Sequence, residues 1–178
     1  DPIVQDLTVR LEAPSAAHLF GTDNFGRDIF SRVMQGAGTT FLVALSTIAF
    51  GCVIGTIIGF TAGYRGGWLD EVVMRINDVV NAFPSILLAL VFVSFFGNGL
   101  FNVIIALGIL FIPSFARIAR SEMLRLKGMQ FVQSAKLVGD SAGRIIFAQI
   151  LPNAYISILS SAAVGFNNAV IAEASLSY

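Results

Sequence analysis

Three long stretches of this sequence contain no charged residue, at positions 33–64, 79–116 and 145–172. A membrane-spanning helix needs about 20 mostly apolar residues to cross roughly 30 Å of hydrocarbon. Charged residues make up only 12% of the chain, which is about half the share usual in soluble domains. This composition excludes a disordered segment and a basic nucleic-acid-binding domain, and it disfavours the buried helices of a large soluble α-protein.

The charge-free stretches predict an all-α membrane protein, a polytopic helical bundle with four spans in this chain. The first and third stretches each hold one span. The second is too long for one helix, and the turn signal Phe96-Gly97-Asn98-Gly99 divides it. The predicted spans are residues 39–63, 78–96, 101–118 and 152–174.

Lys and Arg side chains gather on one side of the predicted membrane. Eight of the eleven lie in the loops after the first and third spans, and the other three precede the first span. Cytoplasmic loops carry the excess of Lys and Arg, so we expect both of these loops in the cytoplasm. Residues 1–38 then form an extracytoplasmic segment, and residues 39–178 form a transmembrane domain with a cytoplasmic loop at 120–151.

Glycines recur every four residues along the first predicted span. Small residues let helix backbones approach closely in lipid, where there is little hydrophobic drive between helices. We interpret the stripe as helix packing, with a sliding surface in a moving transporter as the alternative. It consists of Gly51, Gly55, Gly59 and Gly63.

Two prolines, Pro84 and Pro113, fall inside predicted spans. Proline removes a backbone donor and kinks a helix. Each proline therefore predicts a bend in its helix. The bend either lines a transport pathway or is a fixed structural bend without such a role.

The long cytoplasmic loop predicts two short helices, at residues 130–138 and 142–151, joined at Gly139. Asp140 or Ser141 caps the second helix, and Pro152 ends it where the last span begins. Such a hairpin lies on lipid or enters a groove on a partner, and its mixed charge favours the partner. The first helix places Phe131, Ala135 and Val138 on one face, and the second brings Ile145, Ile146 and Gln149 together.

Few polar residues lie in or beside the spans. Arg75 is expected to pair with Glu71 and Asp78 near the start of the second span, as a solvated helix end. Amides and acids inside spans are costly and often functional. The candidates for a pathway role are Asn167, Asn168 and Glu173.

The loop resembles the EAA loop of permease subunits in bacterial ABC importers. That pattern is Glu-Ala-Ala, three residues, Gly, nine residues, Ile, one residue, Leu-Pro. The matching residues here are Gln133-Ser134-Ala135, Gly139 and Leu151-Pro152, with departures at Gln133, Ser134 and Gln149.

Other segments resemble the second permease of dipeptide, oligopeptide and nickel importers, and together they cover nearly the whole chain. The segment from His18 to Asp28 is similar to the GTDxxGRD motif of that permease. Family members usually have one further span at each end, so we expect six spans in a complete chain. Further matches are AGYRGGWLD from Ala62, NAFP from Asn81, ILPN from Ile150 and AEASLS from Ala172.

The resemblance implies a type I ABC importer permease in the bacterial inner membrane. Its partners would be a paralogous permease, two cytoplasmic ATPases, an extracytoplasmic solute-binding protein and membrane lipid, without nucleic acid. The EAA-like loop would couple the permease to an ATPase. Asp23, Arg27 and Asp28 would contact the binding protein, or else form a salt-bridged cap on the first span.

The chain itself is expected to carry no cofactor and no metal. It has no G-x-x-x-x-G-K-[ST] loop, so ATP belongs to another chain. The lone His18 and the lone Cys52 argue against a Cys/His metal site. The resemblance implies a di- or oligopeptide as the solute, with nickel or a nickel chelate as the alternative. A self-contained channel would need a selectivity filter, and a membrane enzyme would need reactive groups in the spans.

The predicted orientation is tested by labelling cysteines in a Cys52→Ala background. A cysteine at Asn98 should react with a membrane-impermeant thiol reagent added outside intact cells. A cysteine at Lys136 should react only after the membrane is opened. The reverse labelling pattern would show that the orientation is wrong.

Overall fold

The computed structural model describes residues 2–97 and 99–176, without the side chain of Ile86, so that Asn98 of the predicted turn lies outside it. The described residues are almost all helical, and their only strand-like pairing is an isolated bridge between Thr22 and Asp28. The chain divides into two compact units, Asp1–Leu42 and Val43–Tyr178. Each unit is described by itself.

In the first unit, a short 3₁₀ helix (η1, Leu7–Val9) precedes the start of α1 (Ile29–Arg65). The Asp28 carboxylate accepts hydrogen bonds from the backbone N–H (2.8 Å) and the hydroxyl (2.7 Å) of Ser31. This N-cap satisfies donors that the first turn would otherwise leave free. The helix therefore begins ten residues before the predicted span, and that span, residues 39–63, lies within α1.

In the second unit, α1 packs closely against α4 (Leu100–Lys127) along the glycine stripe. A Cβ added at Gly55 would lie 2.6 Å from the Ile112 carbonyl oxygen and 2.7 Å from the Phe115 Cβ. One added at Gly51 would lie 2.8 Å from the Phe111 Cβ. Gly59 meets the Ala116 backbone and Gly63 meets the Met123 side chain, so all four glycines face α4.

The expected second span is two separate helices, α2 (Gly67–Asn81) and α3 (Ser85–Phe96). Pro84 does not kink a helix but stands at the N-cap of α3. Proline disfavours helical geometry at the residue before it, and its missing N–H costs nothing at a helix start. The prediction of one span over residues 78–96 was therefore wrong, and α3 has only 12 residues.

The predicted turn after α3 is present in the described residues around it. Gly97 has a φ of 88°, a left-handed conformation that favours glycine. The Asn102 side chain donates hydrogen bonds to the carbonyls of Phe96 (2.5 Å) and Gly97 (3.2 Å). An amide from α4 thus caps the last carbonyls of α3.

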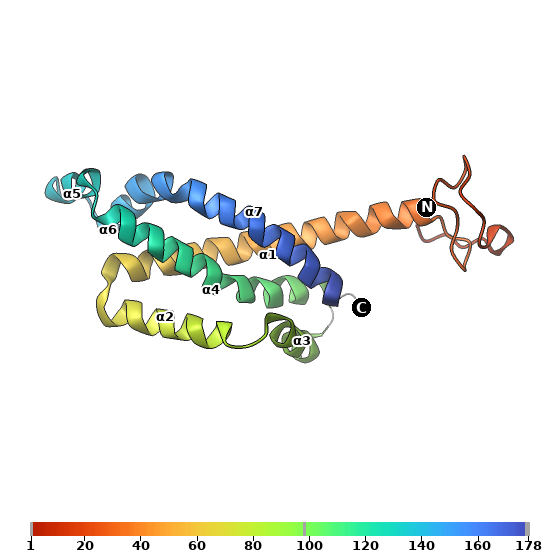
Figure 1. Cartoon of the computed structure of the whole chain (residues 1–178), viewed down its shortest axis with the longest axis horizontal. Helices are drawn as coiled ribbons and strands as arrows, with labels where there is room; N and C mark the ends of the chain where they lie inside the picture. Colours follow the sequence, from red (N-terminus) through yellow and green to blue (C-terminus); the bar gives the residue numbers. More distant parts are fainter. Residues whose placement is uncertain (1, 98, 177–178) are drawn as a thin grey trace. The chain divides into compact units, whose positions relative to one another are not determined.

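The α4 helix continues through Pro113, which is buried, and extends to Lys127 rather than to residue 118. It is followed by the short helices α5 (Gln130–Leu137) and α6 (Ala142–Arg144), the π-helical segment η2 (Ile145–Ile150) and α7 (Leu151–Leu176). Figure 1 shows α5 projecting beyond the end of α4.

Pro152 does not end a helix as predicted, because α6, η2 and α7 form one continuous helix over Ala142–Leu176. The Leu151 N–H donates to the Ile146 carbonyl, five residues back, as in a π-helix. A π-turn is wider than an α-turn, so it leaves room for the proline ring. The helix also continues although Pro152 has no N–H to donate to a carbonyl of the preceding turn.

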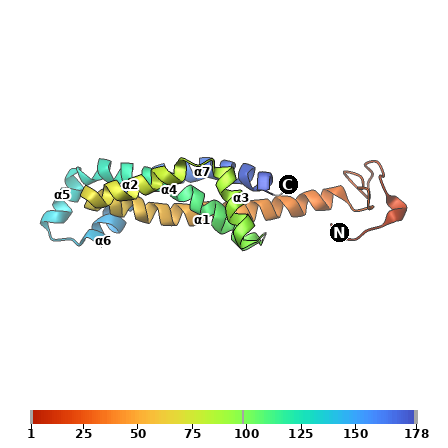
Figure 2. The same ribbon diagram turned by 90° about the horizontal axis from the view of Figure 1, so that it is seen from below.

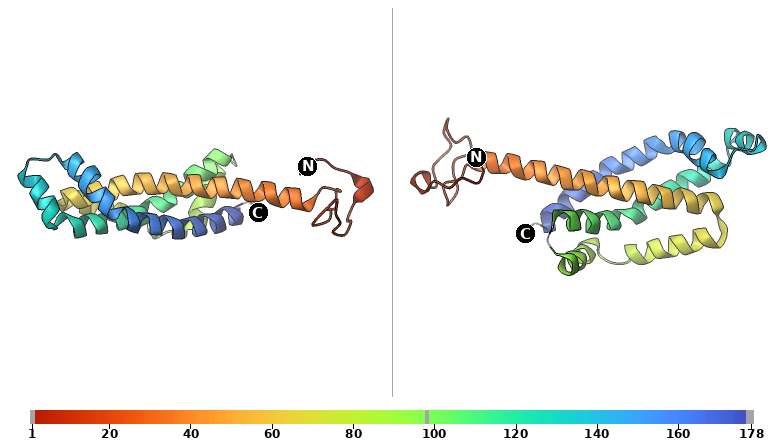
Figure 3. Two further views of the ribbon diagram at one scale, coloured as in Figure 1. Left: turned by 90° about the horizontal axis from the view of Figure 1, so that it is seen from above. Right: turned by 180° about the vertical axis from the view of Figure 1, so that it is seen from behind.

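Among the described residues, three helices are long and apolar enough to cross a membrane: Ile29–Arg65, Leu100–Lys127 and Ala142–Leu176. A fourth apolar segment, Leu87–Phe96, is shorter. Within the second unit, α2, α3 and α7 all contact α4, which runs through the middle of the helices (Figure 2, Figure 3). Large apolar side chains point outward from the helices, among them Val53, Ile57, Phe95, Phe101 and Leu159. An apolar exterior of this kind fits lipid.

The contact between α1 and α4 is tested by adding one methyl group at Gly55. Gly55→Ala should lower the stability of the purified protein by on the order of 1–3 kcal/mol, because backbone atoms of α4 occupy the space. Gly38→Ala is the control, since nothing lies within 4 Å of its added Cβ. Thermal unfolding in detergent measures both, and equal midpoints would contradict the packing.

Candidate functional site

The turn after α5 is a helix stop that requires glycine. Gly139 has a φ of 90°, its N–H donates to the Lys136 carbonyl, and the Asp140 N–H donates to the Ala135 carbonyl. These two bonds and the left-handed residue define a Schellman motif. An added Cβ at Gly139 would meet nothing within 4 Å, so the constraint is the backbone conformation itself.

The next helix begins directly after this turn. The Ser141 hydroxyl accepts from the Arg144 N–H at 3.4 Å, as an N-cap does. The Asp140 carboxylate lies 3.4 Å from the Arg144 guanidinium. Gly139 and the two residues after it therefore set the angle between α5 and the α6–η2–α7 helix.

The inner face of α5 is packed against its own chain. Ala135 is 7% exposed and, with Val132, belongs to a cluster that includes Leu126, Ile145 and Ile150. Residues of α4 and η2 therefore cover the Ala135 side of α5. This packing anchors α5 to the membrane helices.

The outer end of α5 is exposed and apolar. Leu137 is 88% exposed and Val138 is 85% exposed. Val138 therefore does not share a face with Ala135, as the helical spacing had predicted, because the helix ends at Leu137. Of the other residues in the EAA-like pattern, Gln133 and Ser134 are exposed, Leu151 is half-buried and Pro152 is exposed.

Two lysines link this hairpin to the end of α1. The Lys127 Nζ donates to the carbonyls of Gly63 (3.3 Å) and Tyr64 (2.5 Å), where a cation complements the helix C-terminus. The Tyr64 ring lies 5.5 Å from Lys127 Nζ and 5.6 Å from Lys136 Nζ. Both distances are in the cation–π range, so α1, α4 and α5 meet at Tyr64.

An ion pair between α2 and α4 was missed by sequence reasoning. Arg120 donates to both oxygens of Asp70, at 2.5 and 2.7 Å, and Asp70 is only 9% exposed. The Arg120 guanidinium beside Asp70 lowers the pKa of that carboxyl. A second pair joins Asp78 to Arg117 at 2.9 Å. The predicted partner of Asp78, Arg75, instead lies 3.8 Å from Glu71.

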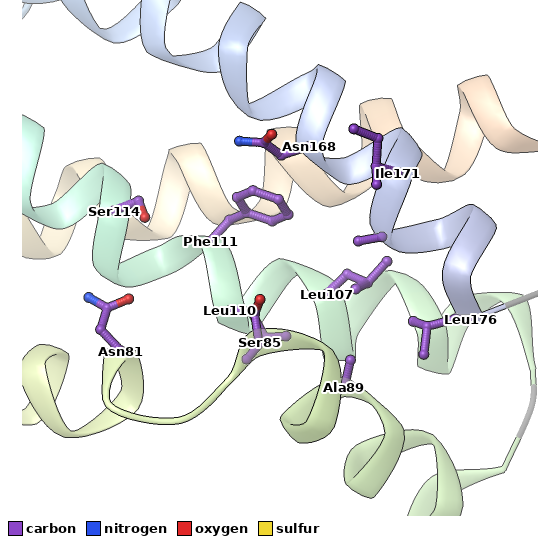
Figure 4. A pocket seen from close by; sticks show the side chains of 11 residues that line it. Asn81, Ser85, Ala89, Leu107, Leu110, Phe111, Ser114, Asn168, Ile171 and Leu176 are labelled. Atoms are coloured by element: carbon purple, nitrogen blue, oxygen red, sulfur yellow. The ribbon is translucent and has the colours of Figure 1, made fainter.

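A cavity of about 350 Å³ opens among α2, α3, α4 and α7 (Figure 4). Asn81, Ser114 and Asn168 lie around Phe111 in this cavity, and Ser85 lines it beside Leu110. A neighbouring cavity of about 400 Å³ shares Phe111, Ser114 and Asn168 with it. The two cavities therefore adjoin each other beside α4, and together they form a recess whose walls are mostly apolar.

The three predicted pathway residues are separated by the structure. Both asparagines are exposed, but Asn168 lines the recess and Asn167 lies outside it. Glu173 lines a different cavity of about 570 Å³, with Ser94 of α3.

The predicted extracytoplasmic contact residues form a local network in the first unit. The Asp23 carboxylate accepts from the side chains of Arg27 (2.8 Å) and Arg32 (2.6 Å). Desolvation raises the pKa of Asp23, but the hydrogen bonds from Arg27 outweigh it and the pKa is lowered. Hydrogen bonds from Ser31 likewise lower the pKa of Asp28. The geometry is that of the salt-bridged cap, one of the two interpretations.

An all-helical chain with long apolar helices and outward-facing apolar side chains is a polytopic membrane protein. The family model of the binding-protein-dependent transport system inner membrane component matches residues 55–178, and the chain belongs to this family. It is therefore a membrane component of a transport system, and its resemblance to importer permeases is confirmed.

Several curated permeases are similar to this chain. The dipeptide transport system permease protein DppC of Alkalihalophilus pseudofirmus is 43% identical over 169 residues, or 95% of this chain and 56% of the relative. The glutathione transport system permease protein GsiD of Pectobacterium atrosepticum is 41% identical, over 94% of this chain and 56% of the relative. The probable D,D-dipeptide transport system permease protein DdpC of Escherichia coli is 38% identical, over 100% of this chain and 60% of the relative. The chain thus spans somewhat over half the length of these relatives.

The ion pair between α2 and α4 is tested with Asp70→Asn. At neutral pH this change should destabilise the protein by about 1–2 kcal/mol, because it leaves Arg120 without its carboxylate. A lowered folded-state pKa stabilises the fold above the unfolded-state pKa of about 3.9 and loses that effect as pH falls through the folded-state value. The difference in unfolding midpoint between wild type and variant should therefore shrink in acid.

Glu71→Gln is the matched control on the same helix, because its partner Arg75 is 3.8 Å away and both side chains are exposed. It should shift the midpoint little. An Asp70→Asn effect no larger than that of Glu71→Gln would contradict a stabilising role for the pair.

Proposed function

We propose that this chain is a permease subunit of an ATP-driven importer, where it forms half of the translocation pathway for di- or oligopeptides. The observation that carries the proposal is the α5–Gly139 hairpin, with its anchored inner face and apolar exposed end. Family membership supports the transport role. The dipeptide and glutathione systems named for the relatives support the peptide solute.

The hairpin is suited to dock into another protein. Leu137 and Val138 lie side by side at the end of α5, between the charged residues Lys136 and Asp140. The Lys and Arg distribution predicts that this loop is cytoplasmic, where water would make two exposed apolar side chains unfavourable. An apolar groove on a cytoplasmic ATPase would cover them.

The anchored face would carry the motion of that partner into the membrane. Val132 and Ala135 are packed against α4 and η2, and Lys136 lies over Tyr64 at the end of α1. A short helix held on three sides moves as a rigid body with the helices that it contacts. ATP binding and hydrolysis would then be the work of two partner ATPases, since this chain has no P-loop.

The other proposed partners are a paralogous permease, which supplies the second half of the pathway, and an extracytoplasmic solute-binding protein. Asp23 and Arg27 lie on the segment that such a binding protein would meet. A nickel or nickel-chelate importer is the alternative, because its permeases share these sequence motifs. A self-contained channel would have no use for the hairpin.

The coupling role is tested in proteoliposomes that hold the complete transporter. Leu137→Asp together with Val138→Asp should leave the amount of permease in the membrane unchanged, because both side chains are already exposed. Loss of the apolar contact should abolish co-purification of the ATPases, or their stimulation by loaded binding protein. Gly139→Val should have the same effect, since a β-branched residue disfavours a φ of 90°.

Ala142→Asp is the matched control, because it adds a charge to the same hairpin at an exposed first position of a helix, where an acid is tolerated. This variant should bind and stimulate normally. Normal transport by the Leu137/Val138 and Gly139 variants would show that the hairpin is not the coupling element.

A further inference from the structure

Two groups of polar side chains stand out within the apolar helices of the second unit. In the first group the side chain bonds to a backbone carbonyl of its own helix, one turn back. Examples are Ser94 to Leu90, Ser161 to Ser157 and Ser175 to Ile171, each at 2.8 Å. These groups are satisfied locally and offer little to a ligand.

The second group lines the recess beside α4. Within the described residues, the side chains of Asn81, Ser114 and Asn168 have no hydrogen-bond partner. They come from α2, α4 and α7, which are distant in sequence, and Figure 4 shows them around the same cavity. An amide or hydroxyl facing lipid is costly, so this convergence needs water or a ligand.

We propose that this recess is a peptide-contact site, at which Asn81, Ser114 and Asn168 hydrogen-bond the backbone amides of a short peptide in transit. The inference rests on the proposed function, and it specifies which residues of the pathway contact the peptide. The cavity volume of about 350 Å³ is in the range of small-ligand pockets.

The lining chemistry matches a peptide backbone better than any particular side chain. Amides and hydroxyls both donate and accept, so they pair with peptide N–H and C=O groups in either direction. The rest of the wall is apolar and includes Leu107, Phe111 and Ile171, which give side chains of varied shape a non-directional surface. Such a site binds peptides weakly and without regard to their sequence.

The charge of the lining also defines the class of solute. No described residue that lines the cavity is charged, and Glu173 belongs to a different cavity. A neutral wall neither retains nor repels peptides according to their net charge. A site for a bare divalent cation would need carboxylate, imidazole or thiolate ligands instead.

The test changes the charge of the recess without changing its shape. Asn168→Asp in the complete transporter, reconstituted in proteoliposomes at about pH 8 to keep the carboxyl ionised, should favour cationic over anionic peptides. The ratio of lysyl-lysine to glutamyl-glutamate uptake should rise about tenfold over wild type. Ser114→Asp, on a different helix, should shift the ratio in the same direction.

Asn167→Asp is the matched control, because it makes the same substitution one residue away and outside the recess. Its uptake ratio should stay at the wild-type value. Binding-protein-stimulated ATP hydrolysis is measured alongside, because a wild-type transporter without it would contradict the proposed function itself. A wild-type transporter that works, with equal ratios for Asn168→Asp, Ser114→Asp and Asn167→Asp, would overturn the peptide-contact site.

Discussion

The close contact between α1 and α4 determines how the rest of the membrane unit is arranged. In lipid, helices gain little by hiding apolar surface, and packing of backbone against backbone replaces that gain. The glycines on α1 meet α4 from Gly108 to Met123. Their four-residue spacing slightly exceeds one helical turn, so the stripe winds slowly and keeps the two helices in contact over several turns.

This contact makes α4 the element that the two candidate sites share. Ser114 lines the recess, and Lys127, 13 residues further along the same helix, holds the end of α1 beside the hairpin. The axial separation of these two residues is about 20 Å. The ion pair of Arg120 with Asp70 joins α2 to α4 between them. A displacement of the hairpin would therefore move the residues of the recess directly, because both are attached to the same continuous helix α4.

Local sequence signals predicted the features that depend on local chemistry. Gly139 was recognised as a helix stop, the glycine stripe as a distinct face of the first span, and Gly97 as part of a turn. The pair of Asp70 and Arg120 could not be predicted, because its members are 50 residues apart and the pairing depends on how α2 lies on α4. The burial of Ala135 could not be predicted for a similar reason, since η2 reaches that side of α5 only through the tertiary fold.

The prolines and amides show that residue type alone does not determine where a helix breaks or whether a polar side chain finds a hydrogen-bond partner. Pro84 stands at the start of α3, after a break in the helix. Pro152 lies inside a continuous helix, because the wider π-turn before it leaves room for the proline ring. Asn102 is used to cap α3, whereas Asn168 has no partner in the described chain. A polar side chain in a membrane helix costs free energy until something pairs with it. Three such side chains, Asn81, Ser114 and Asn168, meet in the recess beside α4, where water, solute or another subunit can pair with them.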